Sequence, residues 1–183
     1  MNDESLPQLR LVPGAKGRWW SQDDCRLKVL DEPPKDCNWS VEVIEDDTFR
    51  VFSAPLEIPE VSEHPVRVMT GVLYAKPLSL GQFLWAKGKQ PRQLYAIVYD
   101  SDLEHLTSIE CLEQTWRKLW QLAKEESWPS LLVPLLGATH ASFRREEIID
   151  AFMGELPKSQ AIDVYLIAPG SYHRELLTAL SSN

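Results

Sequence analysis

The second half of this sequence alternates short apolar runs with amphipathic segments, and this alternation restricts the fold more than any other feature. Three apolar runs have the composition of strands that are buried on both faces, at residues 94–99, 131–136 and 164–167. Apolar residues then recur at helical spacing, which predicts helices over residues 109–128, 144–156 and 172–180. Strands and helices in this order predict an α/β fold, a layered mixed sheet flanked by helices, with right-handed crossovers.

The first half of the chain contains nine of the 13 prolines, which suit turns and strand ends better than helix interiors. We therefore expect an N-terminal β-rich elaboration of the same domain. Residues 1–20 are predicted to form an extended or partly ordered arm that becomes anchored at Trp19 and Trp20. Residues 21–183 are predicted to form a single domain.

Two short segments of the first half alternate apolar with polar residues in the way that hairpin strands do. Residues 41–43 and 49–51 are predicted to pair with each other. The turn between them is predicted at residues 45–47, because Glu45-Asp46-Asp47 has a turn-forming composition.

Three further elements are predicted around this hairpin. Residues 26–30 alternate in the same way, which predicts a third strand beside the hairpin with Leu27 and Val29 on one face. Residues 66–74 are apolar and β-branched, which predicts another strand. A helical turn is expected over residues 78–85.

The charge balance excludes several classes of partner. With 19 Lys and Arg against 27 Asp and Glu, the formal net charge is −8, which repels nucleic-acid backbones and anionic membranes. We therefore expect no general nucleic-acid binding. The apolar run at residues 131–138 is too short to cross a bilayer, and the acidic first residues do not resemble a secretion signal. We expect no membrane association.

The cysteines and the known motifs give little sign of a metal or a cofactor. Cys25, Cys37 and Cys111 have no C-x-x-C spacing, which argues against a disulfide framework and a cysteine zinc site and fits a cytoplasmic protein. The chain has no calcium-loop, H-E-x-x-H, Walker, Rossmann or G-x-S-x-G pattern. We therefore expect neither a metal nor a cofactor.

A polar cluster follows the first buried strand. Asp100 opens a run of carboxylates that ends in His105, at the end of a strand where open α/β sheets bind ligands, so Asp100 is a candidate ligand-binding residue. The favoured alternative is structural. Asp102 or Thr107 is predicted to cap the next helix, with Glu110 completing a capping box.

The segment 130–143 reads Ser-Leu-Leu-Val-Pro-Leu-Leu-Gly-Ala-Thr-His-Ala-Ser-Phe: a buried strand containing proline, then a loop with a glycine, before a helix that begins Arg-Arg-Glu-Glu. This segment resembles the macro domain family. The strand at 94–99, the helix that carries Trp116 and the strand at 164–167 follow the family's order. The resemblance extends over residues 92–183 and implies a macro-like fold.

The resemblance implies binding of ADP-ribose or a related nucleotide diphosphate. In the family, backbone N–H groups of a glycine-rich loop hold the diphosphate, and the N-terminus of the next helix favours the anion. Here the loop contains one glycine, while Thr139 and Ser142 offer hydroxyl donors. The ligand-binding residues predicted for this chain are Gly137, Ala138, Thr139, His140, Ser142, Phe143 and Asp100.

The same resemblance implies binding without strong catalysis. The family's asparagine segment and glycine run have no counterpart here, because Gly71, Gly81 and Gly88 are scattered. A nucleotide-type small molecule is therefore the leading partner. Two alternatives stay open: a protein-interaction module on a macro-derived fold that has lost its pocket, and a hydrolase with His140 as its acid-base group.

Overall fold

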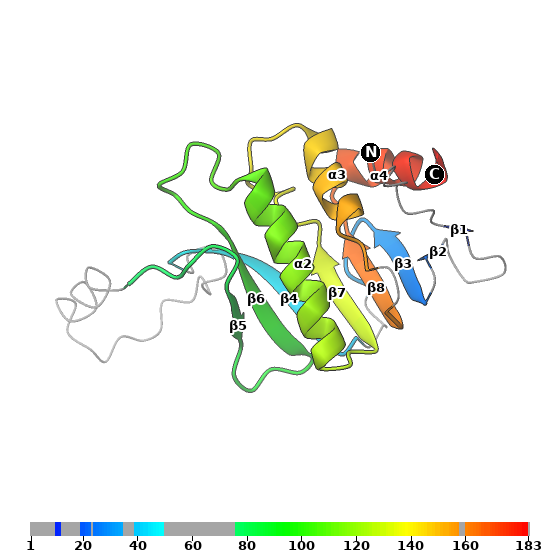
Figure 1. The fold of residues 1–183 in the computed structure, drawn as a ribbon, viewed down its shortest axis with the longest axis horizontal. Coiled ribbons are helices and arrows are strands. Elements are labelled where there is room, and N and C mark those ends of the chain that lie inside the picture. The colour runs from blue at the N-terminus through cyan, green and yellow to red at the C-terminus, as the bar shows by residue number, and fades with distance from the viewer. Residues whose placement is uncertain are drawn as a thin grey trace, which may run out of the picture.

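The computed structural model describes residues 10–11, 19–22, 24–34, 39–49, 76–157 and 160–182. These residues form an eight-stranded sheet in the order β1-β2-β3-β8-β7-β4-β6-β5 (Figure 1). The strands are β1 (Arg10–Leu11), β2 (Trp20–Gln22), β3 (Cys25–Leu30), β4 (Val41–Asp47), β5 (Phe83–Trp85), β6 (Arg92–Tyr99), β7 (Ser130–Pro134) and β8 (Ile162–Ile167). The helices within these ranges are α2 (Ile109–Glu125), α3 (Arg145–Gly154) and α4 (Ser171–Ser182).

The centre of the sheet is parallel and its margins are antiparallel. The strands β3, β8, β7, β4 and β6 each run parallel to their neighbours in this group. At the margins, β5 is antiparallel to β6, and β1 and β2 continue antiparallel beyond β3. The α/β mixed sheet predicted from the sequence is confirmed. The carboxyl ends of these parallel strands lie along one edge of the sheet, which we call the carboxyl edge.

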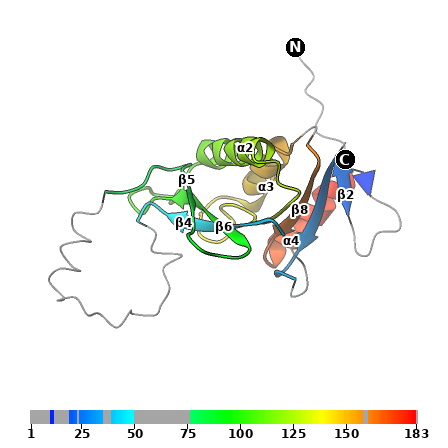
Figure 2. The same cartoon turned by 90° about the horizontal axis from the view of Figure 1, so that it is seen from below.

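Two helices lie side by side on one face of the sheet. Figures 1 and 2 show α2 and α3 together on this face, and α4 lies beside α3 at the end of the sheet. The ring of Trp116 in α2 stacks on Trp120 at 5.5 Å between centroids and meets Phe152 of α3 edge-on at 5.0 Å. Each large apolar side chain that this interface buries contributes about 1.5–3 kcal/mol to folding.

The elements of the second half lie where the sequence predicts them. In β6, residues 96–99 are all 0% exposed, as expected of a strand that is buried on both faces. The first predicted helix begins at Ile109, and the second begins at Arg145 and ends before Pro157. The apolar residues whose spacing predicted these elements are the residues that the sheet and helices bury.

The predicted hairpin is wrong. β4 continues through the acidic residues and pairs in parallel with β6 on one side and β7 on the other. Local hydrogen bonds hold the acidic residues in the strand end: Asp46 Oδ1 accepts the N–H of Asp47 at 2.9 Å, and Asp47 Oδ1 accepts the N–H of Phe49 at 2.8 Å. Side-chain bonds of this kind also stabilise turns, which explains why composition alone misassigned the segment. Residues 50–51 lie outside the described residues.

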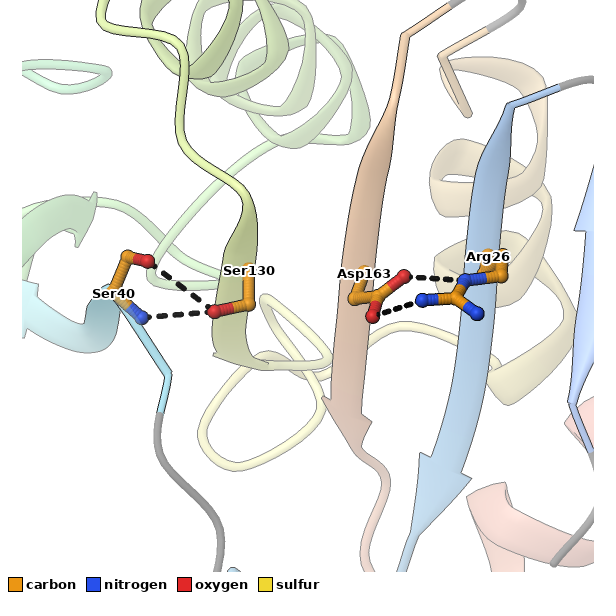
Figure 3. Close-up of polar contacts among 4 residues, drawn as sticks. All are labelled: Arg26, Ser40, Ser130 and Asp163. Carbon is orange, nitrogen blue, oxygen red and sulfur yellow. Dashed lines mark hydrogen bonds and ion pairs between the residues drawn. The ribbon is translucent and has the colours of Figure 1, made fainter. Parts of the chain in front are cut away.

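The predicted strand at 26–30 exists, but its predicted neighbour is wrong. β3 pairs with β8 and β2, with Leu27 and Val29 buried. Figure 3 shows how the guanidinium of Arg26 fastens β3 to β8 by donating from Nε to Oδ1 of Asp163 at 2.6 Å.

A second polar contact joins the starts of two parallel strands. Ser40, just before β4, donates its backbone N–H to Oγ of Ser130 in β7 at 3.0 Å (Figure 3). The two hydroxyls are 3.3 Å apart. The contact lies at the end of the sheet opposite the carboxyl edge.

Three other predictions in the first half have different outcomes. The helical turn expected over 78–85 is wrong, because a turn leads there into β5 at the sheet margin. The strand expected over 66–74 lies outside the described residues, as does most of the predicted arm. At the end of that arm Trp20 is 2% exposed, and the ring of Trp19 meets Tyr165 edge-on at 5.3 Å.

Candidate functional site

The loop between β7 and α3 contains Gly137 and lies at the carboxyl edge. Gly137 has a φ of +87°, a left-handed conformation that side chains disfavour. A Cβ atom at this position would lie 2.7 Å from Cδ1 of Leu112 in α2. Both the backbone and the packing therefore require glycine here.

The backbone N–H of Gly137 donates a hydrogen bond to a carboxylate. Oε1 of Glu45, near the end of β4, accepts it at 2.7 Å. Oε2 of the same carboxylate accepts the hydroxyl of Tyr99, the last residue of β6, at 2.9 Å. The carboxylate of the half-buried Glu45 thus joins two parallel strands and the loop.

Burial is the main influence on the pKa of this carboxylate. Removal from water raises the pKa of Glu45 from 4.5 to about 7. Hydrogen bonds from Tyr99, Gly137 and Thr139 act in the opposite direction, because they stabilise the ionised form. Burial and the neighbouring Glu45 likewise raise the pKa of Tyr99, which keeps its phenol protonated as a donor.

The rest of the loop is folded on itself. Ala138 donates its N–H to the carbonyl of Leu135 at 3.0 Å, and Ala141 donates to the carbonyl of Gly137 at 3.2 Å. The side chains of Thr139, His140 and Ser142 are exposed at its surface. These hydroxyl and imidazole groups are accessible to a ligand in solution.

Two aromatic contacts connect the loop to β6 and the segment after it. The ring of His140 meets Tyr99 edge-on, with centroids 5.1 Å apart. The ring of Phe143 lies 5.3 Å from that of His105, which follows β6. The structure therefore brings the predicted loop residues next to the segment that Asp100 opens.

Asp100 itself has a local role in that segment. Its Oδ1 accepts the N–H of Asp102 at 3.0 Å, and its own N–H donates to the carbonyl of Leu106 at 2.6 Å. The predicted capping is wrong: Ser108 is the N-cap of α2, and its hydroxyl accepts the N–H of Cys111 at 3.1 Å. Ser108 adopts the extended backbone that an N-cap needs, whereas Asp102 lies in the preceding turn.

The two arginines at the start of α3 already have acidic partners. Glu147 accepts hydrogen bonds from the N–H of Arg144 at 3.0 Å and from its Nε at 3.3 Å, and these bonds lower the pKa of Glu147. Nε of Arg145 lies 2.7 Å from Oε1 of Glu175 in α4. Positive charge is unfavourable at the N-terminus of a helix, and the two glutamates compensate it here.

Glu45 and Tyr99 are not among the site residues that the sequence predicts. The sequence predicts a turn at Glu45, and it predicts Tyr99 only as the end of a buried strand. Glu45 lies near the end of β4 and Tyr99 ends β6, and the parallel pairing of these two strands is what brings the residues together. Three consecutive acidic residues after an alternating strand were the one signal available, since acidic groups at a strand's carboxyl end often belong to a site.

A cavity of about 620 Å³ lies elsewhere, between α3 and α4. Its lining includes the charged residues Arg145, Asp150, Arg174 and Glu175 together with the apolar Ile149 and Ala179. None of the predicted ligand-binding residues lines this cavity.

Within the described ranges, no three His, Cys, Asp or Glu side chains converge in a way that can hold a metal ion. Each helix in those ranges is too short or too polar to span a lipid bilayer. Cys25 and Cys111 are not in disulfides.

Known structures share this fold. The sequence matches no protein-family model and no curated protein, whereas 118 chains of solved structures match the structure. A macrodomain from Oceanobacillus iheyensis with ADP is 14% identical, with a TM-score of 0.65 over 90% of this chain and 96% of that one. The macrodomain of Thermus aquaticus DarG is 15% identical, with a TM-score of 0.55 over 79% and 99% of the two chains.

A third similar structure is the macro domain of ganglioside-induced differentiation-associated protein 2. It is 14% identical, with a TM-score of 0.56 over 84% of this chain and 81% of that one. The chain has the macrodomain fold. The likeness to the Oceanobacillus structure covers 90% of the chain, well beyond residues 92–183, where the sequence resemblance was found.

Proposed function

We propose that this domain binds a nucleotide-derived ligand through a phosphate at residues 137–143, without strong catalysis. The fold supports the proposal, since the Oceanobacillus macrodomain that it resembles was solved with ADP. The position of the loop supports it as well. Ligands of open α/β sheets bind at the carboxyl ends of the strands, and this loop follows the central strand β7.

One observation carries the proposal: the N–H of Gly137 points at a carboxylate oxygen 2.7 Å away. The loop is therefore already shaped to hold an anionic oxygen by a backbone donor. Carboxylate and phosphate oxygens accept such hydrogen bonds in the same way. A phosphate on a nucleotide-type ligand is the chemistry that this loop suits best.

Exposed groups around this donor complete the proposed site. Ser142 supplies a hydroxyl for a phosphate oxygen, and the imidazole of His140 supplies a further donor. The hydroxyl of Thr139, which donates to Glu45 in the free protein, can turn to the ligand as well. Phe143, packed beside His105, offers an apolar surface at the end of the loop. In this proposal Asp100 contributes through the turn it stabilises.

Calorimetric titration with ADP-ribose, ADP, NAD and inorganic phosphate tests the proposal. We expect heat of binding with at least one of the nucleotides. Ser142→Ala should weaken that binding by about fivefold, the usual contribution of one hydrogen bond. Ser181→Ala is the matched control, because Ser181 is an exposed serine of α4 whose hydroxyl bonds only within its own helix, to Leu177. Absence of heat with every ligand contradicts the proposal.

The second candidate function is a protein-interaction module on the same fold. The bond between Gly137 and Glu45 favours it too, because a donor that is satisfied internally needs no ligand. Phe49 and Leu103 add exposed apolar surface on the segments after β4 and β6, at 47% and 40% exposure. The same titrations separate the two functions, since an interaction module should give no heat with any nucleotide.

A further inference from the structure

The carboxylate of Glu45 lies where the proposed ligand's anionic oxygen must bind. It accepts the N–H of Gly137 at 2.7 Å, and its other oxygen accepts the Tyr99 hydroxyl at 2.9 Å. A hydrogen on nitrogen makes one strong hydrogen bond at a time. A phosphate that uses this donor therefore has to compete with Glu45.

The groups that face Glu45 come from three elements. Tyr99 approaches from β6, and Gly137 and Thr139 approach from the loop, all three as hydrogen-bond donors. Burial raises the pKa of the Tyr172 phenol in α4 and Arg145 lowers it, and the charge of Glu45 is a weaker influence that also raises it. His140 lies against Tyr99 on the loop side. The three donors to Glu45 carry no positive charge, so its ionised form has hydrogen bonds there but no neutralising partner among them.

Resting on the proposed function, we propose that Glu45 is an internal competitor for the ligand's phosphate, so that an anionic ligand binds this loop with uptake of one proton by Glu45. Two anions on one buried donor repel each other strongly, because little water screens them. A protonated Glu45 removes that repulsion. Its carboxylic acid can also donate a hydrogen bond toward a phosphate oxygen.

The proposal sets the direction of the pH dependence. Burial already favours the protonated form of Glu45 in the free protein, and the negative charge of a bound phosphate favours that form further. The affinity for an anionic ligand should therefore fall as the pH rises through about 7, by up to about tenfold per pH unit. Below that pH the affinity should level off, because Glu45 is already protonated.

The test is calorimetric titration of ADP-ribose and ADP into the full chain between about pH 5.5 and 8.5, in buffers of different ionisation enthalpy. The wild type should take up close to one proton per ligand at the alkaline end. Glu45→Gln keeps the size and the acceptor oxygen but cannot ionise. It should bind more tightly than the wild type at alkaline pH, with no proton uptake.

Two further variants separate Glu45 from other titrating groups. Glu42→Gln removes the same charge from the same strand, at a residue near the start of β4 whose carboxylate accepts a hydrogen bond from Gln93. It should keep the wild-type pH profile. His140→Gln removes the loop's imidazole, whose protonation also favours anions at low pH, and the alkaline fall in affinity should persist in it.

The outcomes separate this inference from the proposed function. Nucleotide binding without proton uptake, with the same pH profile in wild type and Glu45→Gln, overturns the inference and leaves the proposed function standing. Nucleotide binding by Glu45→Gln but not by the wild type supports the inference. Absence of binding by both proteins overturns both. Should Glu45→Gln fail to fold, the proton count of the wild type decides by itself.

Discussion

Glu45 accepts a 2.7 Å hydrogen bond from the backbone N–H of Gly137, a residue 92 positions further along the chain. The bond joins the end of one parallel strand to the loop after its neighbour in the sheet. It fixes the loop in a conformation that holds an anionic oxygen, and the anion it holds is the protein's own. The stability, the ligand binding and the pH response of this domain should all depend on this pair.

Stability should depend on pH through Glu45. Its pKa is raised from 4.5 to about 7 by folding, so the folded state favours the protonated carboxyl. This contribution is fully present below about pH 4.5 and is lost as the pH rises through about 7. Between about pH 5 and 8, Glu45→Gln should gain up to about 3 kcal/mol in unfolding free energy relative to the wild type.

Denaturant unfolding over that pH range measures this difference. Glu42→Gln serves as the control and should follow the wild type in its pH dependence. Parallel stability curves for wild type and Glu45→Gln would show that folding does not shift the titration of this carboxyl.

Tyr99→Phe should destabilise the protein more at high pH than at low pH. It removes the hydroxyl that donates to Oε2 of Glu45 at 2.9 Å, and a buried charge that loses a donor costs about 1–3 kcal/mol. Below the pKa of Glu45 the carboxyl is neutral and the cost should be smaller. In a Glu45→Gln background the cost should become independent of pH, which urea unfolding of the two single variants and the double variant can measure. A loss that is equal at all pH values and in both backgrounds would contradict a role for the hydroxyl in holding the charge.

Gly137→Ala should destabilise the domain by about 1–3 kcal/mol, because it combines left-handed strain with a clash. The clash is the 2.7 Å approach to Cδ1 of Leu112. Gly88→Ala is the matched control, since Gly88 also has a positive φ, of 68°, but nothing lies within 4 Å of its added Cβ. It should lose about 1 kcal/mol, the backbone cost alone. Thermal unfolding measures the loss of stability in the two variants. Equal losses would contradict the prediction, because they would mean that the contact with Leu112 adds no destabilisation.

Ser108→Ala should cost about 1 kcal/mol of stability, the usual contribution of an N-cap. Its hydroxyl accepts the N–H of Cys111 in the first turn of α2. Asp102→Ala should stay within about 0.5 kcal/mol of the wild type, because Asp102 lies in the exposed turn before the helix. The reverse order in chemical denaturation would restore Asp102 as the cap.

The sequence predicted the elements whose burial follows a simple period. Residues 96–99 are an apolar, fully buried part of β6, and Trp116 and Trp120 are spaced as on one face of a helix. Both β6 and α2 could therefore be predicted from the sequence. A loop containing Gly137 was predicted to follow the apolar strand at 131–136. These features depend on local chemistry that is visible in the sequence.

The partners of strands could not be predicted in the same way. β4 pairs in parallel with β6 and β7, which follow it at a distance in the chain, and no local pattern specifies such pairing. The acidic residues at its end suggested a turn, since the same side-chain bonds serve turns and strand ends. With β4 misassigned, Glu45 was left out of the candidate site. The predicted ligand-binding residues of the loop remain predictions that the experiments above address.

The most direct test of the central claim follows the backbone amide of Gly137 by ¹H–¹⁵N NMR while ADP-ribose is added at mildly acidic pH. If the loop binds the ligand's phosphate, the Gly137 signal should shift in a saturable way together with those of Thr139 and His140, while Gly88 stays unchanged. A ligand that binds and shifts other amides while Gly137 does not move would contradict the claim, as would a spectrum that ADP-ribose leaves unaltered.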